Sequence, residues 1–127
     1  RKAKAFCKGS IYYNDCGACG QQMVVSPDGM IGVCHAYCYS KKYFINYDSK
    51  FDPFLASYWK EWRFRSPLFI DDCKKCISLG LCGGGCPYNA EKREGSIWNL
   101  DKMFCIHSKK TIKYLVREVS KKALNRK

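Results

Sequence analysis

Cysteine is the residue type that most constrains how this chain can fold. The chain has 127 residues, and ten of them are cysteine, which is far above ordinary usage. A chain of this length suits one small domain with a modest hydrophobic core. We therefore expect cysteine chemistry, in the form of disulfides, zinc sites or iron–sulfur clusters, to hold much of the fold together.

The spacing of the cysteines is most distinctive in the second half of the chain. Residues 73–87 carry the pattern C-x2-C-x5-C-x3-C-P, and eighteen residues then separate Cys86 from a lone Cys105. Two cysteines separated by two residues can direct both sulfurs, and nearby backbone N–H groups, at one metal centre. Three glycines at 83–85 let the backbone approach a bulky inorganic core closely. A proline after the last cysteine is typical of bacterial ferredoxins, in which that cysteine serves a second cluster.

A second group of cysteines lies upstream. Cys16 and Cys19 form another C-x2-C pair, and Cys34 follows them. Residues 21–34 predict a β-hairpin, because they contain a strand-prone Met-Val-Val run and the turn sequence Pro-Asp-Gly at 27–29. The hairpin would carry Cys34 back towards Cys19, so that one turn-and-hairpin unit presents three thiolates.

The other segments predict mainly helices. A helix is expected from Asp52-Pro53 to Ser66-Pro67. Its apolar residues at helical spacing are expected to pack into the core: Phe54, Leu55, Tyr58, Trp59 and Trp62. A further helix is expected from Asp101 onward. It has one apolar stripe opposite lysines and arginines: Ile112, Leu115, Val116, Val119 and Ala123. Residues 35–50 show no clear period, and residues 71–105 are expected to hold little regular structure.

These segments predict a small, irregular α+β fold, in which a β-hairpin and two or three helices are organised around two metal-cluster sites. We expect residues 1–15 to form an N-terminal segment, residues 16–108 to form the cluster-binding domain, and residues 109–127 to form a basic amphipathic C-terminal helix. Such a domain is not expected to be stable without its metal.

The positive charge is concentrated at the end of the chain. The formal net charge is +12, and residues 109–127 contain eight basic residues and one acid, which accounts for +7 of it. A solvated basic helix is the preferred interpretation. A docking surface for an acidic peptide or partner domain comes second, and nucleic acid third.

Three kinds of cysteine chemistry compete at this point. Disulfides require an oxidising compartment. The chain has no apolar run that resembles a signal peptide or a membrane span, so we expect a cytoplasmic protein with no membrane partner. Zinc would use the same thiolates, but C-x2-C-x5-C-x3-C fits no common zinc ribbon or finger. Iron–sulfur clusters are therefore favoured, with zinc as the alternative and Cys38 as a thiol that binds no metal.

The full pattern resembles the SPASM domain, the auxiliary cluster domain of radical S-adenosylmethionine (SAM) enzymes. It reads C-x9-G-x4-C, then C-x2-C-x5-C-x3-C, then a lone cysteine. The matching positions are Cys19, Gly29, Cys34, Cys73, Cys76, Cys82, Cys86 and Cys105.

The resemblance implies two [4Fe-4S] clusters with interleaved ligands. The ligands of the second auxiliary cluster would be Cys73, Cys76, Cys82 and Cys105. Those of the first would be Cys19, Cys34 and Cys86, completed by an upstream cysteine. We choose Cys16 for this position, and Cys7 remains the alternative.

One motif of the complete family is missing. Radical SAM enzymes need C-x3-C-x2-C, but the third position after Cys34-x3-Cys38 is Lys41, and after Cys82-x3-Cys86 it is Asn89. The chain is also too short for the barrel that would carry this motif and bind SAM.

The resemblance therefore implies a C-terminal segment of a longer enzyme that modifies a peptide or protein. The segment would serve electron transfer and help to shape the substrate site. Its partners would be the radical SAM barrel of the same parent chain and the peptide or protein substrate, whereas nucleic acid is not expected. The alternative function is a metal-stapled interaction module, with zinc or iron–sulfur, that has no redox role.

Overall fold

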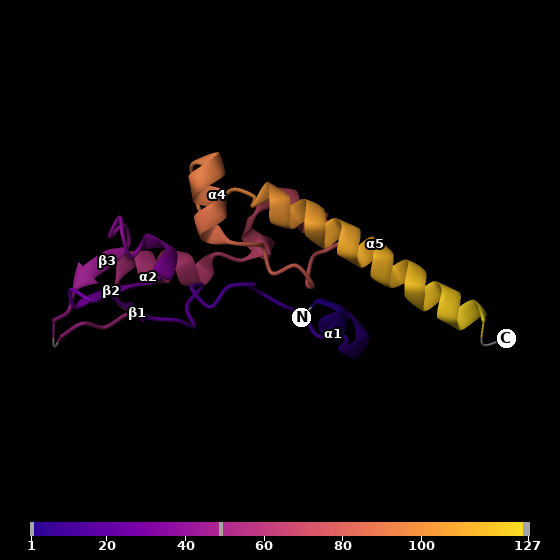
Figure 1. Cartoon of the computed structure of the whole chain (residues 1–127), viewed down its shortest axis with the longest axis horizontal. Helices are drawn as coiled ribbons and strands as arrows, with labels where there is room; N and C mark the ends of the chain where they lie inside the picture. Colours follow the sequence, from indigo (N-terminus) through magenta and orange to yellow (C-terminus); the bar gives the residue numbers. More distant parts are fainter. Residues whose placement is uncertain (1, 49, 126–127) are drawn as a thin grey trace. The chain divides into compact units, whose positions relative to one another are not determined.

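The computed structural model describes residues 2–48 and 50–125 (Figure 1). The chain forms two compact units. The first unit comprises Arg1–Asp15 together with Pro67–Lys127, and the second comprises Cys16–Ser66. The first unit contains most of the helices and the second contains a small sheet. This content confirms the predicted α+β fold class.

The second unit is built on a three-stranded antiparallel sheet in the order β1-β2-β3. β1 (Val24–Val25) and β2 (Met30–Gly32) form the predicted hairpin. β3 (Phe44–Asn46) pairs with β2, so that Ile45 lies opposite Ile31. This third strand was not predicted, because it is short and its segment shows no alternation of apolar and polar residues.

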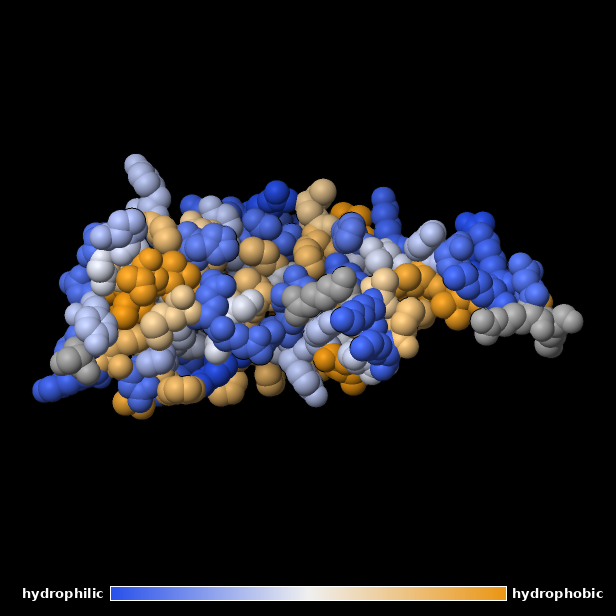
Figure 2. All heavy atoms as spheres, turned by 60° about the horizontal axis from the view of Figure 1, so that its bottom comes forward, coloured by the Kyte–Doolittle hydropathy of each residue, from blue (hydrophilic) through white to orange (hydrophobic). Residues whose placement is uncertain are grey.

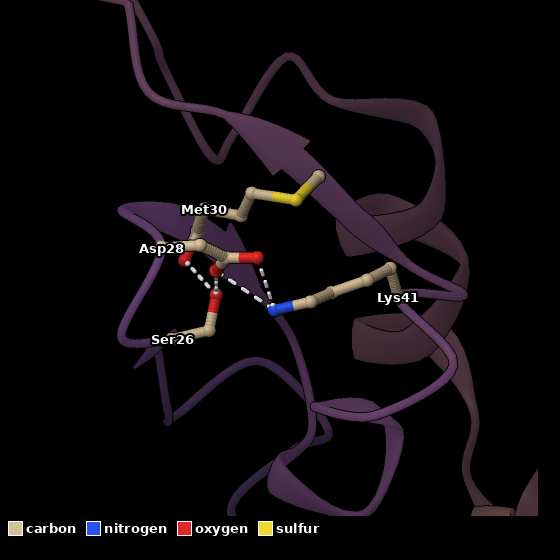
Figure 3. A network of polar contacts seen from close by, with 4 residues as sticks. All are labelled: Ser26, Asp28, Met30 and Lys41. Atoms are coloured by element: carbon tan, nitrogen blue, oxygen red, sulfur yellow. Dashed lines mark hydrogen bonds and ion pairs between the residues drawn. The ribbon is translucent and has the colours of Figure 1, made fainter.

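A polar network holds the hairpin turn (Figure 3). Gly29 adopts a φ of 81°, and its N–H donates to the Ser26 carbonyl at 2.9 Å. The Asp28 carboxylate accepts a hydrogen bond from Lys41 at 2.7 Å and contacts the Ser26 hydroxyl. The Lys41 contact first, and the Ser26 contact second, lower the pKa of Asp28 to about 2. The Lys41–Asp28 pair thus joins the turn to the segment that precedes β3.

Aromatic side chains form the core of the second unit. Trp62 is completely buried, and its ring centroid lies 6.0 Å from that of Tyr37 and 5.2 Å from that of Tyr43. α2 (Ser57–Phe64) carries Trp62 and the buried Trp59. The prediction that these tryptophans pack into the core is confirmed.

The predicted start of this helix was wrong. The Asp52 carboxylate accepts a hydrogen bond from the Phe54 N–H at 2.7 Å, and Ala56 is extended before α2 begins. Asp52 therefore closes a separate local turn, which is the common alternative role of an aspartate at such a position. As a result, Phe54 and Leu55 are exposed to 65% and 70% and do not join the core.

The first unit contains more helix than predicted. Its elements are α1 (Lys2–Lys8), η2 (Pro67–Phe69), α3 (Asp71–Lys74), α4 (Pro87–Glu94) and α5 (Lys102–Leu124). α1 packs against α5. The expectation of little regular structure across residues 71–105 was wrong for α3 and α4. α4 has a proline in its first turn and a glycine in the left-handed conformation at its C-cap, which are common signals for the two ends of a helix.

α5 begins where predicted. Asp101 is its N-cap, and the carboxylate accepts a hydrogen bond from the Phe104 N–H at 3.2 Å. Of the predicted apolar stripe, Ile112 is buried, whereas Val116 and Val119 are exposed. Figure 2 shows hydrophobic and hydrophilic atoms side by side along α5, which is labelled in Figure 1. No helix in the described part of the chain is long and apolar enough to cross a membrane.

Candidate metal centre

A cavity in the first unit brings four cysteines together. Its lining includes Cys73 from α3, Cys76 and Cys82 from the loop that follows, and Cys105 from the first turn of α5. Cys73 is buried and the other three are half-buried. These four residues are the set that the SPASM resemblance assigns to one cluster.

Successive tight turns carry the chain through this loop. The Cys76 N–H donates to the Cys73 carbonyl at 3.0 Å, and the Cys82 N–H donates to the Ser78 carbonyl at 2.9 Å. The Ser78 N–H donates to Cys76 Sγ at 3.4 Å. A backbone N–H directed at sulfur stabilises negative charge on a thiolate, which is the arrangement that a C-x2-C turn was expected to produce.

Asp101 connects the cavity with α4. The residue is only 4% exposed and lines the cavity. Its carboxylate accepts hydrogen bonds at 3.3 Å from the Cys86 N–H and the Asn89 side-chain amide, and it also caps α5. Its carbonyl accepts the Cys105 N–H at 2.8 Å. One buried aspartate therefore fixes the start of α5, which carries Cys105, relative to the start of α4, which follows Cys86.

The three consecutive glycines all adopt positive φ. The values are 72° for Gly83, 83° for Gly84 and 73° for Gly85, a conformation that other residues rarely adopt. Gly84 lines the cavity. A Cβ on Gly83 would lie 2.5 Å from the backbone carbonyl carbon of Asn14 and the backbone nitrogen of Asp15. Gly83 thus permits close approach of another segment of the protein itself.

The chemistry of the rest of the lining is suited to a soft metal group. It is apolar apart from Asp101 and two serines, Ser78 and Ser108. Thiolate ligands select soft centres such as iron–sulfur clusters or zinc, and an apolar lining excludes water. No group of three His, Cys, Asp or Glu side chains in the described residues is arranged to hold a single metal ion.

The other predicted ligand set is divided between the two units. Cys16, Cys19 and Cys34 belong to the second unit, and Cys86 belongs to the first, where it is the N-cap of α4. The Cys19 N–H donates to the Cys16 carbonyl at 3.1 Å, and Cys19 and Cys34 are buried. Cys7, the alternative ligand, lies exposed on α1 in the first unit. The turn and hairpin of the second unit thus carry three of the four residues.

Two features of the cavity were not predicted from the sequence: the burial of Ser78 and one role of Asp101. Asp101 was predicted only as a helix start, because its contact with Cys86 spans 15 residues and no local pattern encodes it. Ser78 lies within the spacer between Cys76 and Cys82. The sequence shows a polar residue between the candidate ligands Cys76 and Cys82, but this pattern does not indicate whether the side chain is buried.

Comparison with known proteins relates the chain to a radical SAM enzyme. The chain is 29% identical over 104 residues to the radical SAM cyclopropyl synthase TigE of Paramaledivibacter caminithermalis, and the alignment covers 82% of this chain and 21% of that protein. The matched region therefore corresponds to about a fifth of the relative's length. No family model and no solved structure matches the chain. The similarity supports a role associated with radical SAM chemistry.

Proposed function

We propose that this chain is the auxiliary iron–sulfur cluster region of a radical SAM enzyme that modifies a peptide or protein. The observation that carries the proposal is the convergence of Cys73, Cys76, Cys82 and Cys105 on one cavity, in a chain related to a radical SAM enzyme. The sequence lacks C-x3-C-x2-C, so the SAM-binding site would be supplied by another part of the parent protein.

The cavity in the first unit would hold the second auxiliary cluster. Its four cysteines would each bind one iron of a [4Fe-4S] core. Such a core, when bound, supplies a one-electron carrier whose potential depends on hydrogen bonds to sulfur and on exposure to solvent. The chain's own residues support this role: the Ser78 N–H donates to the Cys76 sulfur, and apolar neighbours such as Leu79 and Phe104 line the site.

The first auxiliary cluster would use Cys16, Cys19, Cys34 and Cys86. Cys16 is favoured over Cys7 because its carbonyl accepts the Cys19 N–H at 3.1 Å, which places the two residues in one turn of one unit. The Gln22 side-chain amide donates to the Val33 carbonyl at 3.2 Å, which joins the segment after Cys19 to the residue before Cys34. Cys86 lies at the N-terminal end of α4, where it is the N-cap residue.

Within the parent enzyme, this region would accept or supply single electrons during modification of the substrate and would form part of the substrate site. The cyclopropyl synthase activity belongs to TigE by name. For this chain, the substrate class that we propose is a peptide or protein.

Cys82→Ala and Cys86→Ala provide a sharp test, because only three glycines separate the two residues. After anaerobic reconstitution, each variant should retain about half of the wild-type iron and sulfide, since each change removes a ligand of one cluster of two. After reduction with dithionite, the electron paramagnetic resonance signal that is lost in Cys82→Ala should be the same signal that is lost in Cys105→Ala. Cys86→Ala should remove the other signal, the one that Cys19→Ala also removes.

Cys38→Ala is the matched control, since Cys38 belongs to neither ligand set and lies half-buried beside η1 (His35–Tyr37). This variant should retain its full iron and sulfide content. Loss of the same signal in Cys82→Ala and Cys86→Ala would show that the ligand division is wrong.

The alternative, a metal-stapled interaction module, is favoured by one observation. Val116, Val119 and Leu124 are exposed apolar residues on the basic helix α5, which suits a binding surface. Redox activity separates the two functions. If the chain with its metal bound undergoes reversible one-electron reduction, the cluster proposal is supported. If the metal-bound chain cannot be reduced, the interaction module is supported.

A further inference from the structure

Ser78 is a buried hydroxyl group in the cysteine cavity with no hydrogen-bond partner among the described residues. The residue is 1% exposed, it lines the cavity, and its Oγ has no partner. An unpaired polar atom at such a position is rare, because a buried donor that loses its hydrogen bond costs about 1–3 kcal/mol. A missing partner inside the cavity would explain it.

The backbone on both sides of Ser78 is held firmly. Its N–H donates to Cys76 Sγ at 3.4 Å. Its carbonyl accepts hydrogen bonds from the Leu81 N–H at 3.1 Å and the Cys82 N–H at 2.9 Å. The backbone of Ser78 is therefore bonded to both Cys76 and Cys82.

Ser108 provides an internal comparison. It lines the same cavity and is also 1% exposed. Its hydroxyl, however, donates to the Phe104 carbonyl within α5 at 2.7 Å. Of the two serines, Ser78 is therefore the one whose proton is still available to a group in the cavity.

We infer that the Ser78 hydroxyl donates a hydrogen bond to a sulfur of the cluster held by Cys73, Cys76, Cys82 and Cys105, and that it raises the reduction potential of this cluster. The inference rests on the proposed function. In the titration, a chemical reductant such as dithionite supplies one electron to the cluster, no bond is broken, and the proton stays on the serine oxygen. The reduced cluster carries one more negative charge, so the donor stabilises it more than the oxidised cluster.

Potentiometric titration of the reconstituted full chain tests the inference. Ser78→Ala should lower the midpoint potential of the cluster that Cys105 helps to bind. The equilibrium constant for its one-electron reduction should fall threefold to tenfold, and a tenfold fall corresponds to about 59 mV. Ser108→Ala should leave the midpoint unchanged, because its proton is already bound to a helix carbonyl. Ser78→Thr retains a hydroxyl and should preserve the wild-type midpoint.

Iron and sulfide content, measured on the same samples, distinguishes failure of the proposed function from failure of this inference alone. A wild-type chain that takes up no iron and sulfide overturns the proposed function and this inference together. Full uptake by Ser78→Ala with an unchanged midpoint overturns this inference alone. An equal shift in Ser108→Ala also overturns it, since any change in the cavity would then produce the effect. If Ser78→Ala fails to fold, the test uses Ser78→Thr instead. A wild-type midpoint potential in this variant supports the hydrogen bond, and a lowered midpoint potential contradicts it.

Discussion

Gly83→Ala tests how the first unit holds the loop between Cys82 and Cys86. Gly83 has a φ of 72°, and adopting this left-handed conformation costs an alanine about 1–2 kcal/mol. The new Cβ would also lie 2.5 Å from backbone atoms of Asn14 and Asp15. These atoms cannot rotate away as a side chain can, so overpacking adds about 1–3 kcal/mol. We expect the free energy of unfolding to fall by about 2–5 kcal/mol in total.

Gly95→Ala is the matched control. Gly95 has a φ of 84°, but an added Cβ there would meet nothing within 4 Å. The control therefore has only the conformational cost, about 1–2 kcal/mol. Urea unfolding of the reconstituted chains, followed anaerobically by circular dichroism, measures the difference between the two variants. Equal losses would refute the reasoning, because they would mean that residues 14–15 do not pack against Gly83.

Two further predictions concern buried and exposed carboxylates. The pKa of Asp28 is lowered from 3.8 to about 2, so its pairing with Lys41 stabilises the fold fully above about pH 4 and is lost as the pH falls towards 2. Lys41→Met should move the pKa of Asp28 back towards 3.8 in a carboxyl NMR titration, and a value still near 2 would contradict the role of Lys41. Asp101→Ala should lower the free energy of unfolding by about 2–4 kcal/mol, because a helix cap and the partner of a buried N–H are both lost. Asp71→Ala, at an exposed ion pair with Lys74, should leave urea unfolding unchanged, and equal losses in the two variants would contradict the role of Asp101.

Local chemistry explains the elements that were predicted correctly. The Pro-Asp-Gly turn places a glycine where positive φ is needed, and the hairpin follows from it. Asp101 precedes an amphipathic segment and caps α5 as expected. The two tryptophans of α2 have helical spacing and are buried. In each case, a few adjacent residues contain the whole signal.

The elements that were not predicted correctly depend on contacts between residues that are distant in sequence, or on residues that can play more than one local role. β3 exists because Phe44–Asn46 pairs with β2, after Lys41 and Tyr43 take positive φ, and no pattern in the segment indicates this. Asp52 had the features of a helix cap but closes a separate turn. Val116 and Val119 of α5 are exposed although Ile112 is buried, so amphipathic spacing predicts a helix without showing how much of its apolar face is covered.

The candidate site was predictable to a similar extent. The resemblance to the SPASM pattern grouped the four residues that line the cavity. The turns that follow Cys73 and precede Cys82 are local, whereas Cys105 lies far along the chain, and only the resemblance assigned it to this set. Burial of the Ser78 hydroxyl and the contact of Asp101 with Cys86 are tertiary features, which a spacing pattern does not contain.

Metal and sulfide analysis of the anaerobically isolated chain, combined with Mössbauer spectroscopy, tests the central claim most directly. With two complete clusters, the chain should contain about eight iron and eight sulfide ions and give the quadrupole doublets of [4Fe-4S] cores. About two zinc ions per chain with no acid-labile sulfide would contradict the account.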